Sequence, residues 1–311
     1  MNKKILMIIP IVLLGYLIYG SFDSKQEINI PAPIINRVPD SDNVVVSLNK
    51  IDNKDLTEQE IELINNYFND KTVENLEKTK PIVSKFSSQI NSYEESIKKP
   101  YWFNNNIPEN NLITEDLKLP SLSLTRSLAR LYILQLENDL VNGVITKSVY
   151  QDKLQHIYDF GNKIENGSYA HIEFLVGKSI KAMAYDQAVL NKVNLKQSLV
   201  SKEIKERILL SEFSMSENFL KLSKKEMQSR LETEFNFVEL IPVYIPFTFH
   251  KNRTLNYFAT EIPNALSYIE KGNCSSYEPI RKFHWYDWLT PNSFGKMMLS
   301  KALVLPQSLC E

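Results

Sequence analysis

The sequence predicts an all-α fold, an irregular antiparallel helical bundle on a single N-terminal transmembrane helix, with few or no strands. Three observations predict it. Glycine is scarce, at eight of 311 residues, which argues against glycine-looped sheets and glycine-rich dinucleotide sites. Apolar residues recur at helical spacing through the central part of the chain, where Asn-Gly pairs end the helices. The chain also begins with a uniformly apolar segment.

Residues 1–22 are expected to form an uncleaved transmembrane anchor. Lys3 and Lys4 precede an apolar run from Ile5 to Tyr19, and the stretch from Ile5 to Phe22 would span about 27 Å as a helix. The two lysines favour a cytoplasmic N-terminus. A cleaved signal peptide is the alternative, although no small-x-small site follows the apolar run, and a buried core helix is the third interpretation. Either of the first two places the body outside the cytoplasm, in the periplasm if the host has two membranes.

The rest of the chain is expected to be one extracytoplasmic helical domain, residues 44–311, carried on an extended stalk, residues 23–43. The stalk contains prolines that fix φ and disfavour helix in the residue before them: Pro31, Pro33 and Pro39. The β-branched segment Val44–Leu48 is expected to be a lone strand or an extended segment laid on the body.

The helices of the body have local signals of different strength. Thr57 and Glu60 form a capping box that starts one helix. A second helix is expected from Pro81 to Lys98, with the proline in its first turn, and a long loop from Pro100 to Pro120. Three consecutive helices between Ser121 and Val193, joined by short glycine turns, predict an antiparallel core. Small residues on the inward faces mark places where helices cross closely: Gly161, Gly177 and Ala184.

Charge and motifs give no reason to expect nucleic acid or nucleotide partners. The 36 basic and 37 acidic residues nearly balance, whereas nucleic-acid binding needs a basic surface. Gly177-Lys178-Ser179 ends like a phosphate-binding loop, but Ile172 stands where the first glycine belongs, and the segment is expected to be mid-helix.

No catalytic residue, metal site or cofactor is expected from the motifs. The four histidines lie far apart in the sequence and form no H-x-x-x-H pair: His156, His171, His250 and His284. No G-x-S-x-G motif occurs, and paired acids such as Glu94 and Glu95 are most simply solvated helix faces.

Cys274 and Cys310 are the two cysteines of the chain. In an oxidising compartment, two cysteines with no third suggest one disulfide. Two unrelated thiols are the alternative, because pairing depends on geometry that the sequence does not give.

One aromatic constellation near the C-terminus is a candidate ligand patch. A helix would place Trp285 and Trp288 on one side, next to Arg281 and Asp287. Two indoles with charged neighbours can stack on a sugar ring or clamp a peptide. The simpler interpretation is that these rings fill the core, with Arg281 pairing with Asp287 at its rim.

Four short motifs resemble a loose set of membrane-anchored, extracytoplasmic helical proteins of unknown function: Leu128–Leu131, Leu175–Ile180, Asn252–Asn256 and Pro291–Lys296. Ser293-Phe294 departs from the Pro-Val or Pro-Ile of that pattern. The resemblance implies an architecture of anchor and helices and supplies no activity.

Two functions fit these observations. The first is a non-enzymatic partner-binding or scaffolding protein of the cell envelope, with a membrane and an envelope protein as its partners. The alternative is a cell-wall sugar- or peptide-binding protein or hydrolase that uses the Trp-rich C-terminal segment.

Overall fold

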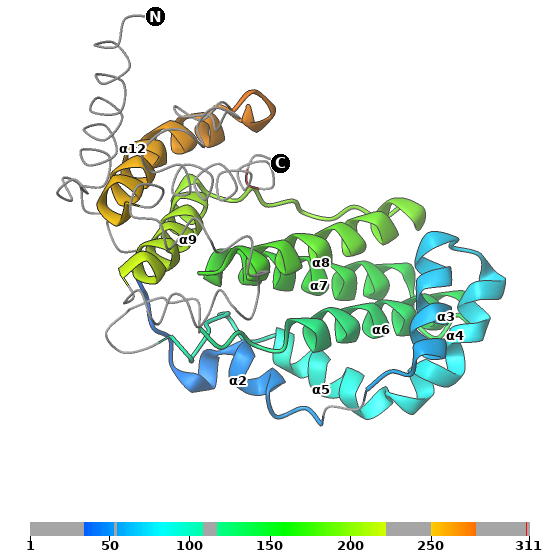
Figure 1. The fold of residues 1–311 in the computed structure, drawn as a ribbon. Helices are drawn as coiled ribbons and strands as arrows, with labels where there is room; N and C mark the ends of the chain where they lie inside the picture. The colour runs from blue at the N-terminus through cyan, green and yellow to red at the C-terminus, as the bar shows by residue number, and fades with distance from the viewer. Residues whose placement is uncertain (1–33, 53–54, 108–116, 222–249, 278–308, 310–311) are drawn as a thin grey trace, which may run out of the picture. The chain divides into compact units, whose positions relative to one another are not determined.

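The computed structural model describes residues 34–52, 55–107, 117–221, 250–277 and 309. Within these residues the chain is mostly helical and contains no strand, which confirms the all-α fold (Figure 1). The chain divides into two compact units. One comprises Ile34–Leu112 and Leu117–Ile204, and is called the body below. The other comprises Met1–Pro33, Ile113–Asp116 and Lys205–Glu311.

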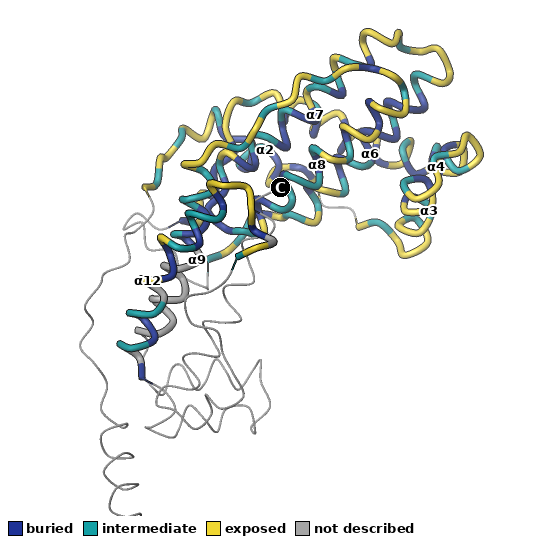
Figure 2. Tube along the Cα trace, turned by 90° about the horizontal axis from the view of Figure 1, so that it is seen from above, coloured by how far each residue is buried: buried dark blue, intermediate teal, exposed yellow. Residues whose placement is uncertain are grey.

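The described residues of the body form one short 3-10 helix and seven α-helices. They are η1 (Asp40–Asp42), α2 (Val44–Leu48), α3 (Glu58–Asn69), α4 (Val73–Lys85), α5 (Ser87–Ile97), α6 (Leu122–Val141), α7 (Lys147–Gly167) and α8 (His171–Leu190). Helices α7 and α8 form an antiparallel pair, and α6 packs against both (Figure 1). The sides of these three helices that face one another are buried (Figure 2).

The three central helices confirm the antiparallel core expected between Ser121 and Val193. Gly143 ends α6 with φ +67°, a conformation that glycine adopts without a steric penalty. Thr146 then caps α7, because its side chain accepts a hydrogen bond from the Val149 amide at 3.3 Å. Most of the apolar side chains expected to face inward are buried at or below 2% exposure; they include Leu128, Leu131, Tyr132, Leu136, Tyr150, Leu154, Ile157, Ile164 and Ile180. The others expected there are only half-buried (Leu124, Leu140, Leu175, Val176 and Met183) or exposed (Ile172).

The predicted close crossing of α7 and α8 is confirmed at two glycines. A Cβ atom built on Gly161 would lie 2.7 Å from the carbonyl oxygen of Gly177, and a Cβ atom on Gly177 would lie 2.7 Å from the carbonyl oxygen of Gly161. Only glycine therefore allows the two backbones to approach this closely.

Val44–Leu48 is a helix, α2, and the expected strand or extended segment is wrong. The Asn43 side chain accepts a hydrogen bond from the Val45 amide at 3.0 Å and so caps the first turn. Val44, Val45 and Leu48 are buried, and this tertiary burial outweighs the strand preference of β-branched residues.

The helix expected from Pro81 to Lys98 is two helices, α4 and α5, separated at Phe86. Thr72 caps α4 by accepting from the Asn75 amide at 3.3 Å, so α4 starts before Pro81 and the proline lies inside it. By contrast, the capping box at the start of α3 is confirmed. Glu60 N donates to the Thr57 hydroxyl at 3.3 Å, and Thr57 N donates to the Glu60 carboxylate at 2.9 Å.

The described end of the expected stalk, residues 34–43, is attached to the body. The Tyr169 hydroxyl accepts from the Asn36 amide at 3.0 Å and donates to the Ile34 carbonyl at 3.3 Å. Asn43 is fully buried, and its side-chain amide donates to the Phe103 carbonyl at 2.9 Å. These contacts also fix the first described residues of the Pro100–Pro120 segment, where no helix forms in the described part.

None of the helices in the described part of the chain combines the length and the apolar character that a bilayer-spanning helix needs. This finding contradicts the expected single-pass membrane protein with an extracytoplasmic body, and we do not retain that localisation. The segment expected to cross the membrane, residues 1–22, lies outside the described residues.

Helix α9 (Lys202–Lys221) begins at the end of the body, and the described part beyond it contains α12 (Lys251–Glu270) and the 3-10 helix η2 (Cys274–Ser276). Cys274 is buried, and no free cysteine occurs among the described residues. Its expected partner, Cys310, lies outside them. Because Cys310 is not described, the pairing of Cys274 with Cys310 stays a prediction.

Candidate functional site

The ligand patch expected near the C-terminus lies outside the described residues. This holds for all four of its members: Arg281, Trp285, Asp287 and Trp288. The patch therefore stays a prediction. By contrast, Gly177-Lys178-Ser179 lies in the middle of α8, as expected for a helix and not for a phosphate-binding turn.

A groove of about 280 Å³ opens on the body. Helix α6 forms one side of it. The junction of α4 and α5, the start of α3 and the segment before α3 form the rest. Its apolar lining consists of Leu56, Ile61, Phe86, Leu124, Leu128 and Leu131, and its polar lining of Asp52, Asp55, Gln89, Ser123 and Ser127.

Helix α6 presents an apolar strip to the groove because of its residue spacing. Leu124, Leu128 and Leu131 are separated by four and three residues, so they lie on one face of the helix. The sequence predicts this face as part of the core. Leu128 and Leu131 are indeed buried, but Leu124 is only half-buried, and all three line the groove.

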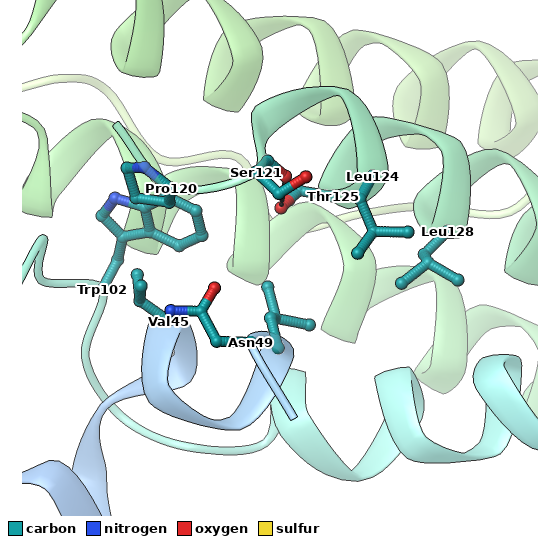
Figure 3. Close-up of a pocket in the computed structure, with 9 residues that line it drawn as sticks. Val45, Asn49, Trp102, Pro120, Ser121, Leu124, Thr125 and Leu128 are labelled. Atoms are coloured by element: carbon teal, nitrogen blue, oxygen red, sulfur yellow. Dashed lines mark hydrogen bonds between the residues drawn. The ribbon is translucent and has the colours of Figure 1, made fainter. Parts of the chain in front are cut away.

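A second, much smaller gap shares part of this wall (Figure 3). Its volume of about 10 Å³ is near the room that one water molecule needs. Figure 3 shows Leu124 and Leu128 one turn apart on α6, with Val45 and Asn49 across the gap and Trp102 at its end. Leu124 and Leu128 therefore connect the interior packing of α2 to the open groove.

Gln89 gives the groove an unsatisfied hydrogen-bond acceptor. The residue is only 5% exposed, and its Oε1 atom is buried without a hydrogen-bond partner among the described residues. A buried acceptor left unpaired costs about 1–3 kcal/mol of stability, and such groups are uncommon in folded proteins. Because this atom is itself buried, it lies behind the surface of the groove.

The lip of the groove is acidic. Asp52 and Asp55 are both exposed, and no lysine, arginine or histidine occurs among the described lining residues. The Lys85 ammonium lies 5.0 Å from the centroid of the Phe86 ring. Lys85 is held by Glu60 at 2.7 Å, and this hydrogen bond lowers the pKa of Glu60.

Three buried glutamates of the body are bonded within the fold. Glu173 accepts from the Tyr169 and Ala170 amides, both at 3.2 Å, and from the Trp102 indole at 3.3 Å. Glu165 pairs with Lys181 at 2.7 Å. Their hydrogen bonds and ion pairs hold helix ends and helix faces together. The sequence did not reveal the distant partners, because the Trp102 indole lies 71 residues from Glu173 and Lys181 lies 16 residues from Glu165 along the chain.

Glu137 is the third buried glutamate and lies where α6, α7 and α8 meet. It accepts hydrogen bonds from the Tyr150 hydroxyl and from the Asn191 amide, the latter at 2.9 and 3.2 Å. Burial raises the pKa of Glu137, and these two hydrogen bonds oppose that shift. The net direction is upward.

We expect the stability of the protein to depend on pH through Glu137. Unfolding restores the ordinary pKa, so the unfolded carboxyl loses its proton at a lower pH than the folded one. The stabilisation that the protonated Glu137 gives the folded state is therefore fully present below the ordinary pKa. It is lost as the pH rises through the raised pKa of the folded state. Urea unfolding of the wild type and of Glu137→Gln, from about pH 4 to about pH 8, measures it. The wild type should lose stability relative to the variant with rising pH, and a difference that is constant over this range would contradict the assignment.

The chain matches no protein-family model, no curated protein and no solved structure. A function is therefore inferred from the geometry of the groove and the bonding of the buried charges.

Proposed function

We propose that the chain is a non-enzymatic partner-binding protein whose groove takes side chains from a segment of another protein. The observation that carries the proposal is the groove itself, where the exposed Ile61 and the half-buried Leu56 and Leu124 lie beside the exposed Asp52 and Asp55. Apolar surface that stays in contact with water is costly in the free protein, and a partner that covers it removes that cost.

The size of the groove suits side chains of a peptide segment. Its volume of about 280 Å³ is enough for a few apolar side chains and is close to the lower end, about 300 Å³, of small-molecule sites. A helical segment that binds in a groove inserts apolar side chains from neighbouring turns, spaced by three or four residues. Leu124, Leu128 and Leu131 have the same spacing, but Leu128 and Leu131 are already buried. The half-buried Leu124 and the exposed Ile61 are the apolar side chains that such a helix would contact.

The bonding of the buried glutamates supports a structural role for the charges inside the body. Glu137, Glu165 and Glu173 each hold two or more segments of the fold together through the contacts given above. The groove, by contrast, combines apolar residues with exposed aspartates and serines. This combination is typical of a recognition surface with an apolar centre and a polar rim.

Filling the groove should abolish peptide binding. A random peptide library is selected on the full-length protein, and the selected peptides are then measured by fluorescence anisotropy. Ser127→Trp places an indole in the groove from α6. It is expected to weaken the binding of the selected peptides at least about tenfold, since the loss of one hot-spot contact has that effect.

Ser148→Trp is the matched control, because Ser148 is an exposed serine on α7 that does not line the groove. It should leave binding unchanged. Peptides that bind the Ser127→Trp protein as tightly as the wild type would show that the groove is not the docking site. Circular dichroism of both variants establishes that the helical fold is retained.

A further inference from the structure

We propose that the segment between α8 and α9 pairs with the same segment of a second copy of the chain and so forms a two-fold symmetric dimer. Residues 194–200, called the linker segment below, form neither helix nor strand and follow the α7–α8 pair as a plain ribbon (Figure 1). None of them lines the groove. The inference therefore concerns a second surface and goes beyond the proposed function.

The body holds the linker segment by every second residue. The Gln155 side chain accepts from the Lys196 amide at 2.8 Å and donates to the Lys196 carbonyl at 3.2 Å. The Tyr158 hydroxyl accepts from the Ser198 amide at 3.4 Å, and the Lys181 ammonium donates to the Ser198 carbonyl at 3.3 Å. Both backbone groups of Lys196 and of Ser198 therefore point at the body. This alternation is typical of an extended chain.

The residues between them offer their backbone groups to the outside. In an extended chain, neighbouring residues point their N–H and C=O groups in opposite directions. Those of Leu195, Gln197 and Leu199 therefore point away from the body, and they bond to no other described residue. A row of unpaired N–H and C=O groups is a template for pairing with a second extended chain.

This edge is already formed in the single chain. Val193 is buried at 7% exposure, and the half-buried side chain of Leu195 packs against the core of the body. Together with the hydrogen bonds of Lys196 and Ser198, these contacts fix the linker segment before any partner arrives. Pairing then costs less conformational entropy than it would for a free loop.

One antiparallel register pairs all three outward residues with the same segment of a second copy. A two-fold axis through the middle of the segment makes the paired chains antiparallel and presents the same surface on both sides. With the axis at Gln197, this residue lies opposite Gln197 of the second copy, and Leu195 lies opposite its Leu199. Each outward residue then exchanges both of its backbone hydrogen bonds with the residue opposite.

The side chains fit this register as well. Leu199 is 97% exposed, the highest exposure of any large apolar side chain described, and pairing gives it Leu195 of the second copy as a neighbour on the same face. On the other face, Lys196 lies opposite the uncharged Ser198, so the register puts no like charges opposite each other there. The order Leu-Lys-Gln-Ser-Leu is therefore complementary to itself, which identifies a second copy as the partner.

Sedimentation equilibrium of the full-length protein, from about 10 µM to about 1 mM, measures the dimer. The average mass should rise with concentration toward twice the monomer mass, because a short pair of chains makes a weak interface. Leu199→Asp places a carboxylate opposite Leu195 in both halves of the dimer and should raise the dissociation constant at least about tenfold.

Val149→Asp is the matched control. Val149 is an exposed apolar residue in the first turn of α7, away from the linker segment, and an acidic residue is favourable there. It should leave the dissociation constant unchanged. A wild type that stays monomeric up to about 1 mM, or a dimer that Leu199→Asp and Val149→Asp affect equally, would contradict the proposal.

Cysteine cross-linking tests the register directly. In the proposed pair, only residue 197 lies opposite itself, with its two Cα atoms about 5.5 Å apart, and a disulfide needs about 4.4–6.8 Å. Treating Gln197→Cys with diamide, which takes up the two electrons and two protons of the thiols, should therefore give a covalent dimer. Asn194→Cys is the control, because its two copies would lie six residues, or about 20 Å, apart. Both variants and the wild type contain the two native cysteines.

A synthetic peptide of residues 193–201 distinguishes a second copy from another partner. It offers the same backbone groups as the second copy, so an excess of it should lower the average mass of the wild type toward that of the monomer. If the peptide binds to a protein that is always monomeric, the edge takes an extended segment of a different protein, and the proposed dimer is wrong. Cross-linking of Asn194→Cys as strongly as Gln197→Cys would overturn the register centred on Gln197.

Discussion

Gly161→Ala is expected to lower the free energy of unfolding by about 2–3 kcal/mol, the range of an overpacked core. The new Cβ atom would lie 2.7 Å from the carbonyl oxygen of Gly177 and 2.9 Å from the amide nitrogen of Lys181. Both are backbone atoms of α8, so neither can move aside by changing a rotamer. Helices α7 and α8 would have to separate, and their shared apolar packing would loosen. Urea unfolding followed by circular dichroism measures the loss.

The sign of this effect is a test in itself, because glycine to alanine in a helix interior ordinarily stabilises by about 0.5–1 kcal/mol. Gly177→Ala should behave like Gly161→Ala, since its Cβ atom would lie 2.7 Å from the Gly161 carbonyl oxygen. Gly143→Ala is the control. A Cβ atom on Gly143 would meet no atom within 4 Å. The variant should therefore lose only about 1–2 kcal/mol of unfolding free energy, because alanine is strained at the positive φ of this position. A gain in stability at Gly161 would mean that the two helices do not cross as closely as described.

The elements that could be predicted from the sequence are those set by local rules. The Thr57 capping box, the Asn142-Gly143 helix end and the helical spacing of α6 to α8 each depend on residues close in the sequence. The glycines of the close crossing could be recognised too, because small residues on an apolar helix face have few other uses there.

Features that depend on distant contacts could not be predicted. Val44–Leu48 has a strand-like composition, and its burial against the body, together with the Asn43 cap, makes it helical. The groove combines α6 with residues 52–89, and these segments are 34 or more positions apart along the chain. Gln89 is an ordinary polar residue in the sequence, and its unsatisfied acceptor becomes evident only when its surroundings are known. The N-terminal apolar run gave the strongest single signal, yet the membrane-spanning protein it suggested is contradicted.

Lys181→Met is expected to lower the free energy of unfolding by about 3–5 kcal/mol, the range for removing one partner of a buried ion pair. The Lys181 ammonium lies 2.7 Å from the Glu165 carboxylate, and the two side chains are only 12% and 2% exposed. It also donates to the Ser198 carbonyl at 3.3 Å and lies 5.3 Å from the centroid of the Tyr158 ring. Without this ammonium, the Glu165 charge stays buried between α7 and α8 and loses the cation that compensates it. Urea unfolding at neutral pH measures the loss.

The double variant Glu165→Met with Lys181→Met decides whether the effect belongs to the pair. Replacing both members of a buried ion pair by apolar residues is often neutral, because the charge that needed compensation is gone. The double variant should therefore be more stable than Lys181→Met alone, and the difference measures the coupling between the two charges. The exposed pair of Lys78 and Glu74 has the same 2.7 Å distance, and Lys78→Met should have a far smaller effect because water screens that pair. If the double variant were as unstable as Lys181→Met alone, lost packing of the lysine stem would explain the result, and the buried charge of Glu165 would not.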